Sequence, residues 1–273
     1  MFQELQPDAF PLARRAFEPM GNNLAINSII EGATPSRIFV DDPQNPQAAI
    51  TWNKARAYLS GNSTDWEFNE GLHDFFQNHL FPEIRATGGE FAILYYAPKN
   101  WEEAAQHLFE GNTVHRHLRH FYQMNAAPPD WRSRLPATYE LLPIDHSLLS
   151  RTTLKNMNSL VEEMQSESPS PAAFLERCFG FCALRGEELV GWCLSEYNSA
   201  DRCEVGIEII EEYQRKGIGT ALASALIEKA TGLDMAVGWH CYAGNVPSVE
   251  LAIRLGFEKI AEYPVFIAEL TNN

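Results

Sequence analysis

The segment from Cys203 to Leu222 constrains the fold of this 273-residue chain more than any other stretch. An apolar run with two embedded glutamates, typical of a β-strand, leads through a basic, glycine-bearing turn into an alanine- and leucine-rich run that is typical of a helix. The first amides of a helix have no acceptor within the helix and lie at the positive end of its dipole, so a phosphate group binds there readily. The segment therefore predicts a strand, a phosphate-binding turn and a helix in succession.

The turn itself contains the residues that an anion site needs. Gly217 and Gly219 let the backbone approach a phosphate closely, and Arg215 and Lys216 supply full positive charges beside it. Two familiar phosphate loops do not fit this sequence. A dinucleotide fingerprint needs a third glycine where this chain has Leu222, and a Walker loop needs a lysine directly after its last glycine.

The turn from Gln214 to Gly219 resembles the Gln/Arg-x-x-Gly-x-Gly/Ala signature of the GNAT acetyltransferase superfamily. A second motif of that superfamily is a later helix ending in Leu-Gly-Phe, and here it reads Asn245-x-x-Ser248-x-x-x-Ala252-x-x-Leu255-Gly256-Phe257. The resemblance covers residues 137–270, and the stretches 238–241 and 262–266 are similar to a bacterial subgroup.

This resemblance implies the GNAT α/β fold, a mixed sheet flanked by helices, with acetyl-CoA as co-substrate and no metal. In the superfamily the turn holds the pyrophosphate of coenzyme A, and free amides of the preceding strand hydrogen-bond the pantetheine arm. Asn245 fits a polar contact to that arm or a helix cap. The implied cofactor-binding residues are Ile207 and Ile209 through their main chain, Gln214, Arg215, Lys216, Gly217, Ile218, Gly219, Thr220 and Asn245.

Glu204 and Glu208 are the candidate general bases for taking a proton from an amine acceptor. In a strand both share one face with Gly206, while the apolar residues between them face the helices. We favour Glu204, because a strand rise of about 3.3 Å per residue places it roughly 13 Å upstream of Glu208, nearer the thioester. A glutamate near that position is the base in some superfamily members. Glu208 is the alternative base, and the alternative for both is a solvated carboxylate at a sheet edge.

A general acid cannot be carried over from the superfamily. Many GNAT enzymes have a tyrosine seven residues after the motif asparagine, where this chain has Ala252. Ser248, His240 or Tyr242 would have to protonate the thiolate instead, and each also fits a purely structural role. Cys241 beside His240 suggests an acyl-enzyme at first, but neighbours in a strand point to opposite faces.

Composition limits the partners. The net charge of −15 argues against nucleic acid, which needs clustered cations, and favours a cationic acceptor, although acidic surfaces also serve solubility alone. The sequence contains no run of eighteen apolar residues, so it indicates no membrane span. The first residues do not show a signal-peptide pattern.

Cysteines and histidines indicate neither a disulfide framework nor a metal site. The five cysteines are odd in number and form no Cys-x-x-Cys pair, so we expect reduced thiols in a cytoplasmic protein. The histidines at 115, 117 and 120 have a spacing that suggests metal ligands. In a strand, however, His120 faces away from the other two, and the neighbouring arginines would repel a cation.

The proline-containing stretch 126–136 predicts a boundary between an N-terminal α/β domain, 1–128, and a GNAT domain, 137–273. In the second domain we expect helices at 148–164, 171–179, 218–230 and 246–255. The expected strands are 139–142, 181–184, 189–196, 203–210, 235–242 and 258–270, the last interrupted at Pro264.

The N-terminal half is predicted to contain strands at 38–41, 48–52, 56–59, 91–96 and 113–123. Helices are expected around 68–80 and from a capping box at Asn100–Glu103 to a point near Gly111. The succession strand, helix, glycine and long strand over 91–123 parallels 235–270. We therefore hypothesise a degenerate partial copy of the same fold, which lacks the glycine motif and so lacks a coenzyme A site.

These observations favour an acetyl-CoA-dependent N-acetyltransferase. The acceptor would be a small amine or an exposed amino group, attacked directly in a ternary complex. Because of Ala252 and the extra N-terminal half, a non-catalytic acyl-CoA-binding or regulatory module is the alternative. A third hypothesis makes the N-terminal half a partner-binding surface, including one for a homodimer.

Overall fold

The computed structural model describes residues 2–124, 131–132 and 135–270, which form two compact units. Unit 1 comprises residues 1–119 and 263–273, and unit 2 comprises residues 120–262. This division differs from the expected domains 1–128 and 137–273, because two long strands, β6 (Thr113–Met124) and β12 (Glu258–Glu269), contribute residues to both units. The predicted boundary residues 126–130 lie outside the described residues.

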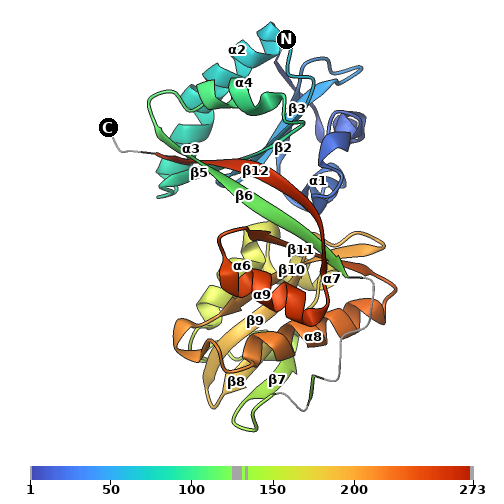
Figure 1. Cartoon of the computed structure of the whole chain (residues 1–273), viewed down its shortest axis with the longest axis vertical. Coiled ribbons are helices and arrows are strands. Elements are labelled where there is room, and N and C mark those ends of the chain that lie inside the picture. The colour runs from blue at the N-terminus through green and yellow to red at the C-terminus, as the bar shows by residue number, and fades with distance from the viewer. Residues whose placement is uncertain (1, 125–130, 133–134, 271–273) are drawn as a thin grey trace. The chain divides into compact units, whose positions relative to one another are not determined.

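Unit 2 is a mixed sheet with helices on both faces, as the sequence predicts (Figure 1). Its strands lie in the order β7-β8-β9-β10-β11-β6-β12. Its elements are β7 (Glu140–Pro143), α5 (His146–Leu149), α6 (Met157–Glu167), α7 (Pro171–Arg177), β8 (Gly180–Arg185), β9 (Glu188–Glu196), β10 (Arg202–Ile209), the short helix η5 (Glu211–Tyr213), α8 (Ile218–Thr231), β11 (Ala236–Tyr242) and α9 (Val246–Leu255), with parts of β6 and β12.

Two predictions about unit 2 are wrong in detail. The helix expected at 148–164 is two helices, α5 and α6, because Asn156 takes a left-handed backbone conformation, φ +67°, just before α6. Strand β12 is not interrupted at Pro264. Its ladder with β5 begins at the next residue, Val265, so the missing amide hydrogen of the proline falls just outside that ladder.

Unit 1 also contains a mixed sheet, with the order β1-β2-β3-β4-β5-β12-β6. Its elements are β1 (Gln3–Glu4), η1 (Pro7–Arg14), η2 (Glu18–Met20), α1 (Leu24–Ile30), β2 (Arg37–Val40), β3 (Ala48–Asn53), β4 (Arg56–Gly61), α2 (Trp66–Phe75), the π-helical η3 (Phe76–Leu80), α3 (Phe81–Ala86), β5 (Phe91–Ala97) and α4 (Trp101–His107), with parts of β6 and β12.

The predicted capping box before α4 is wrong. Asn100 has helical dihedral angles, φ −57° and ψ −19°, and its side chain caps no amide. An N-cap residue needs extended dihedral angles for its side chain to reach the following amides. The helix ends at His107, and a turn carries the chain to Gly111, where φ is +83°.

The strand orders of the two units correspond position by position. In each unit five consecutive strands are followed by one strand from the other half of the chain and then by the last strand of its own half. The fourth and fifth strands, β4 and β5 in unit 1 and β10 and β11 in unit 2, are parallel in both units. The correspondence supports the hypothesis that the N-terminal half is a copy of the same fold.

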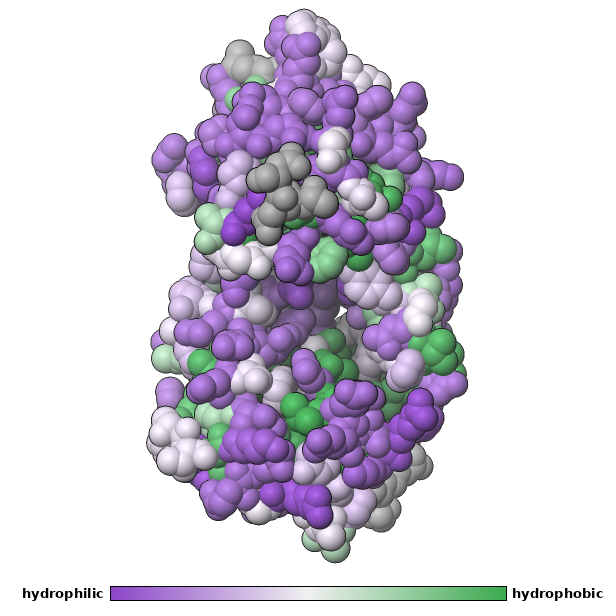
Figure 2. Space-filling view, turned by 90° about the vertical axis from the view of Figure 1, so that its left-hand side faces the viewer, coloured by the Kyte–Doolittle hydropathy of each residue, from purple (hydrophilic) through white to green (hydrophobic). Residues whose placement is uncertain are grey.

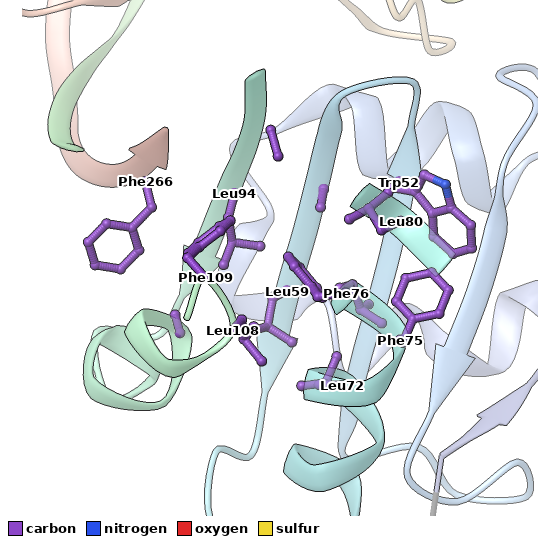
Figure 3. Packing of buried hydrophobic residues seen from close by; sticks show 14 of the residues in the cluster. Trp52, Leu59, Leu72, Phe75, Phe76, Leu80, Leu94, Leu108, Phe109 and Phe266 are labelled. Carbon is purple, nitrogen blue, oxygen red and sulfur yellow. The ribbon is translucent and has the colours of Figure 1, made fainter. Parts of the chain in front are cut away.

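An aromatic core holds unit 1 together (Figure 3). Phe75 packs against Trp52 with ring centroids 4.7 Å apart, and Phe76 meets Phe109 edge to face at 5.6 Å. Phe266 of β12 completes this core by stacking on Tyr96 at 5.1 Å. Each such pair adds about 0.5–1.5 kcal/mol beyond the burial of its apolar area. The C-terminal strand is therefore an integral part of the N-terminal fold.

In unit 2 the odd-numbered residues of β10 and β11 face α8 and α9, and the even-numbered residues face the other way. Cys203, Val205 and Val237 are buried in one cluster with residues of both helices.

Most of the face drawn in Figure 2 is hydrophilic, in keeping with the acidic composition. Among the described residues, no helix is long and apolar enough to span a bilayer.

Candidate active site

Strands β10 and β11 separate part-way along their length. They pair in parallel over only three positions, from Arg202 opposite Ala236 to Glu204 opposite Gly238. Beyond these positions β10 continues to Ile209 and β11 to Tyr242, but no further pairing between them is found in the described part of the chain. The sheet thus has an opening between two parallel strands that starts at Glu204.

The main-chain groups of Ile207 and Ile209 point into this opening. The amide of Ile210 donates to the carbonyl of Val190 on the other neighbour, β9, over 3.0 Å. Because the direction of backbone groups alternates along an antiparallel pair, the even-numbered residues of β10 face β9 and the odd-numbered residues face β11. The N–H and C=O groups of residues 205, 207 and 209 are therefore directed to the side from which β11 has departed.

The turn that follows β10 leaves the start of α8 without a side-chain cap. Arg215 and Gly217 both have left-handed backbone conformations, with φ +60° and +81°, and Gly217 occupies the N-cap position. The first backbone bond of the helix runs from Ala221 to the carbonyl of Gly217. Within the described residues, no group accepts a hydrogen bond from the amides of residues 218–220. These amides lie at the positive end of a 14-residue helix, which is where an anion binds best.

The other residues of the predicted phosphate motif surround this helix start. Gln214 donates from Nε2 to the carbonyl of Ile209 over 3.1 Å, and Lys216 donates from Nζ to the carbonyl of Glu212 over 2.7 Å. Ile218 and Thr220 are buried, whereas residues 214–217 are exposed. A methyl group on Gly219 would lie 3.4 Å from Leu251 of α9 and 3.6 Å from Ile209. The space at Gly219 therefore admits alanine, in keeping with the Gly/Ala position of the motif.

In unit 1 the corresponding strands stay paired, and the corresponding helix start is capped by a side chain. Strands β4 and β5 stay paired over five positions, from Arg56 opposite Ile93 to Ser60 opposite Ala97. The helix that follows, α2, is capped by Asp65, whose carboxylate accepts from the amide of Phe68 over 3.0 Å. A carboxylate at this place both occupies the amides and repels a phosphate.

The structure distinguishes the two candidate bases. Glu204 has a side chain only 12% exposed, and its Oε1 lies 3.5 Å from Nε2 of His240, which is 7% exposed. Glu208, on the same face of β10, is exposed. A buried carboxylate at the point where the strands part can meet a reacting group that is shielded from water, whereas Glu208 faces solvent.

Two residues that the sequence did not indicate complete the surroundings of Glu204. Phe121 of β6 stacks on His240, with ring centroids 4.5 Å apart and planes within 19°. Glu196 of β9 lies directly opposite Glu204 in the ladder, and its side chain lies over Gly206, in the space where a Cβ atom would be. Glu196 can be named as the group that approaches Gly206 only once the register of β9 and β10 is known.

In the motif around α9, the side chains of Asn245 and Ser248 both accept hydrogen bonds. Asn245 caps α9 by accepting from the amide of Ser248 over 3.3 Å. The hydroxyl of Ser248 accepts from Nε1 of the buried Trp239 over 3.0 Å, which leaves its own hydrogen available for donation. Ala252, at the position of the superfamily's tyrosine, is fully buried in the core.

The described cysteines are free thiols, and two of the histidines lie beside glutamates. All five cysteines are free, and burial raises the pKa of Cys203 to about 12, which disfavours the thiolate. Cys241 is buried in the helix-facing core, on the face opposite His240. His120 pairs with Glu262 over 2.9 Å, and His115 lies 3.5 Å from Glu269. No group of three metal-ligating side chains occurs among the described residues.

Comparison with known proteins decides the family. The family model described as GNAT acetyltransferase matches residues 14–266. The chain belongs to the GNAT acetyltransferase family. A relative named as an uncharacterized N-acetyltransferase, YdfB of Bacillus subtilis, is 23% identical over 269 residues, which are 97% of this chain and 98% of that protein. This GNAT protein is thus an acetyltransferase by family, over nearly its whole length.

Solved GNAT structures share the fold. A GCN5-related N-acetyltransferase-like protein from Streptococcus suis has a TM-score of 0.72 at 20% identity and covers 96% of this chain and 99% of its own. A tandem GNAT protein from the clavulanic acid biosynthesis pathway has a TM-score of 0.60 at 12% identity and covers 100% of this chain and 99% of its own. The sequence motifs indicated the family for residues 137–270 only, whereas the match includes the N-terminal half.

Proposed function

We propose that this GNAT protein transfers an acetyl group from acetyl-CoA to an amine by direct attack in a ternary complex. The observation that carries the proposal is the opening between β10 and β11 beside the uncapped start of α8. An extended chain bearing a diphosphate at one end fits that combination, because backbone donors line the opening and free amides lie at its end.

The cofactor would be held mainly by backbone. The amides of residues 218–220, with Gly217 and Gly219 permitting close approach, would bind the pyrophosphate, and Arg215 and Lys216 would add charge. The main chain of Ile207 and Ile209 would hold the arm, and Asn245 stands at the start of α9. Acetyl-CoA supplies the activated thioester; the protein supplies position and proton transfer.

Glu204 would take the proton from the attacking amine, either directly or through water. Its carboxylate is the buried one of the pair, at the point where the strands part. Glu208, exposed four residues further along the strand, would be a solvated neighbour rather than the base. Ser248 would donate a hydrogen bond to the departing thiolate, because its hydroxyl hydrogen is available and Ala252 has no acidic group. The proton that Glu204 takes from the amine balances the one that the thiolate gains, directly or through water.

The acceptor would be a small amine or an exposed amino group, and a cationic one would be favoured. The net charge of −15 attracts cations from a distance, and Glu196 adds a second carboxylate opposite Glu204.

Release of free coenzyme A thiol, followed colorimetrically with acetyl-CoA and a panel of mono- and polyamines, amino acids and aminoglycosides, tests the proposal. We expect turnover with at least one amine, and a faster reaction with acceptors that carry a further positive charge. The second candidate function, a non-catalytic acyl-CoA-binding module, is favoured by the buried Ala252. Binding of acetyl-CoA without turnover on any amine of the panel would support that candidate and contradict the proposal.

A further inference from the structure

Glu204 and Glu196 form a like-charged pair across two neighbouring strands. They are directly opposite each other on neighbouring strands and share one face of the sheet. Two carboxylates in such positions repel each other, and partial burial strengthens the repulsion. His240 lies on the other side of Glu204, with its Nε2 3.5 Å from Oε1, and it is nearly buried. An imidazolium at this place lowers the cost of keeping Glu204 ionised.

The imidazole of His240 is fixed from a second direction. Phe121 stacks on it at 4.5 Å with nearly parallel planes, and the same ring lies over Gly238, where a Cβ atom would be only 3.1 Å away from it. A side chain at 238 would therefore press on the ring of Phe121. The ring of His240 is therefore held between an aromatic face and a carboxylate.

We propose that His240, held by Phe121, is a positioning residue that orients the carboxylate of Glu204 and keeps it ionised for proton transfer; this rests on the proposed function of Glu204 as base. His240 itself does not touch the reacting atoms. It acts through Glu204, so that it sets the pH at which the base becomes available rather than the chemistry of the step.

Other ionisable groups share this face of the sheet. Arg202 and Glu208 lie on the same face of β10 as Glu204, Glu196 lies on β9, and Tyr242 lies two residues beyond His240 on β11. Phe121, the contact from β6, carries no charge. Replacing His240 alone removes one of these ionisable groups and leaves the others in place. A shift of the pH profile along the pH axis therefore reports on His240.

The test compares His240→Gln with His120→Gln in the full-length protein. His120 also pairs with a glutamate of the same unit, with its Nε2 2.9 Å from Oε2 of Glu262. Because side chains alternate along β6, His120 lies on the face opposite Phe121 and His240. In His240→Gln we expect the acidic limb of kcat/KM against pH to move to higher pH by about one unit, because an opposite charge within about 4–6 Å has been removed. In His120→Gln the limb should stay in place.

Three results would overturn the inference. One is an acidic limb of kcat/KM that does not move in His240→Gln. Another is a kcat/KM that His240→Gln lowers by the same factor at every pH. The third is a shift of the limb in His120→Gln as large as that in His240→Gln. If His240→Gln does not fold, NMR titration of the His240 ring in wild type and in Glu204→Gln decides instead. The ring should lose its proton at lower pH in Glu204→Gln, and an unchanged titration would refute the coupling. If the wild-type protein acetylates no amine, the proposed function fails, whereas the ring titration still tests the coupling on its own.

Discussion

Replacing Glu204 by glutamine is expected to lower kcat for amine acetylation by a factor of about 10² to 10⁴, the contribution of a positioned general base. The change keeps the size of the side chain and removes the proton acceptor at the point where β10 and β11 part. Coenzyme A affinity should stay within about threefold of wild type, because the proposed cofactor contacts are backbone groups further along the strand and at the start of α8. Steady-state kinetics and a binding titration on the same preparation measure both quantities.

Glu208→Gln is the matched control for this experiment. It makes the same chemical change on the same strand face, roughly 13 Å away by strand rise, at an exposed side chain. We expect kcat for Glu208→Gln to stay within about threefold of wild type, because a general base acts only within hydrogen-bond reach of the proton that it removes. A larger loss in Glu208→Gln than in Glu204→Gln would assign the base to the other glutamate.

Gly217→Asp should abolish most coenzyme A binding. The substitution places a carboxylate at the start of α8, as Asp65 already does at the start of α2 in unit 1. Each charge-assisted hydrogen bond lost to a phosphate removes about 1.5–3 kcal/mol, so the dissociation constant should rise at least about 10²-fold. Isothermal calorimetry measures the change, and thermal unfolding checks that the variant is folded.

Gly217→Asn separates charge from backbone strain. Gly217 has φ +81°, a region that asparagine and aspartate tolerate better than other side chains. The two variants therefore suffer similar strain and differ in charge alone. We expect the asparagine variant to bind coenzyme A at least about tenfold more tightly than the aspartate variant, because the added negative charge lies next to the diphosphate. Equal affinities would show that strain, not anion binding, governs this position.

The two units differ at both features of the proposed cofactor site. Unit 1 retains the order of strands, but β4 and β5 stay paired and Asp65 occupies the helix start. Unit 2 opens the same pair of strands after Glu204 and leaves the helix start uncapped. The N-terminal half instead contributes Phe121, through β6, to the surroundings of Glu204 in unit 2.

Features that depend on neighbouring residues in the chain could be predicted from the sequence. The turn at 214–219 and the helix after it depend on residues that are neighbours in the chain, and α9 occupies the predicted range Val246–Leu255. The alternation along β10 predicted that Glu204 and Glu208 share a face, which the structure confirms through the register with β9. The family followed from the same short motifs.

Features that depend on the pairing of strands far apart in the chain could not be predicted from the sequence. Phe121 reaches His240 because β6 inserts beside β11, and no local pattern encodes that insertion. Glu196 faces Glu204 only in the observed hairpin register, which a shift of one residue would abolish. The two compact units divide the chain differently from the predicted domains, because β6 and β12 contribute residues to both units.

Calorimetric titration of the purified protein with coenzyme A tests the central claim most directly. The opening in unit 2 and the closed counterpart in unit 1 predict saturable binding with a stoichiometry of one per chain. Absence of binding, or two equivalent sites per chain, would contradict the account.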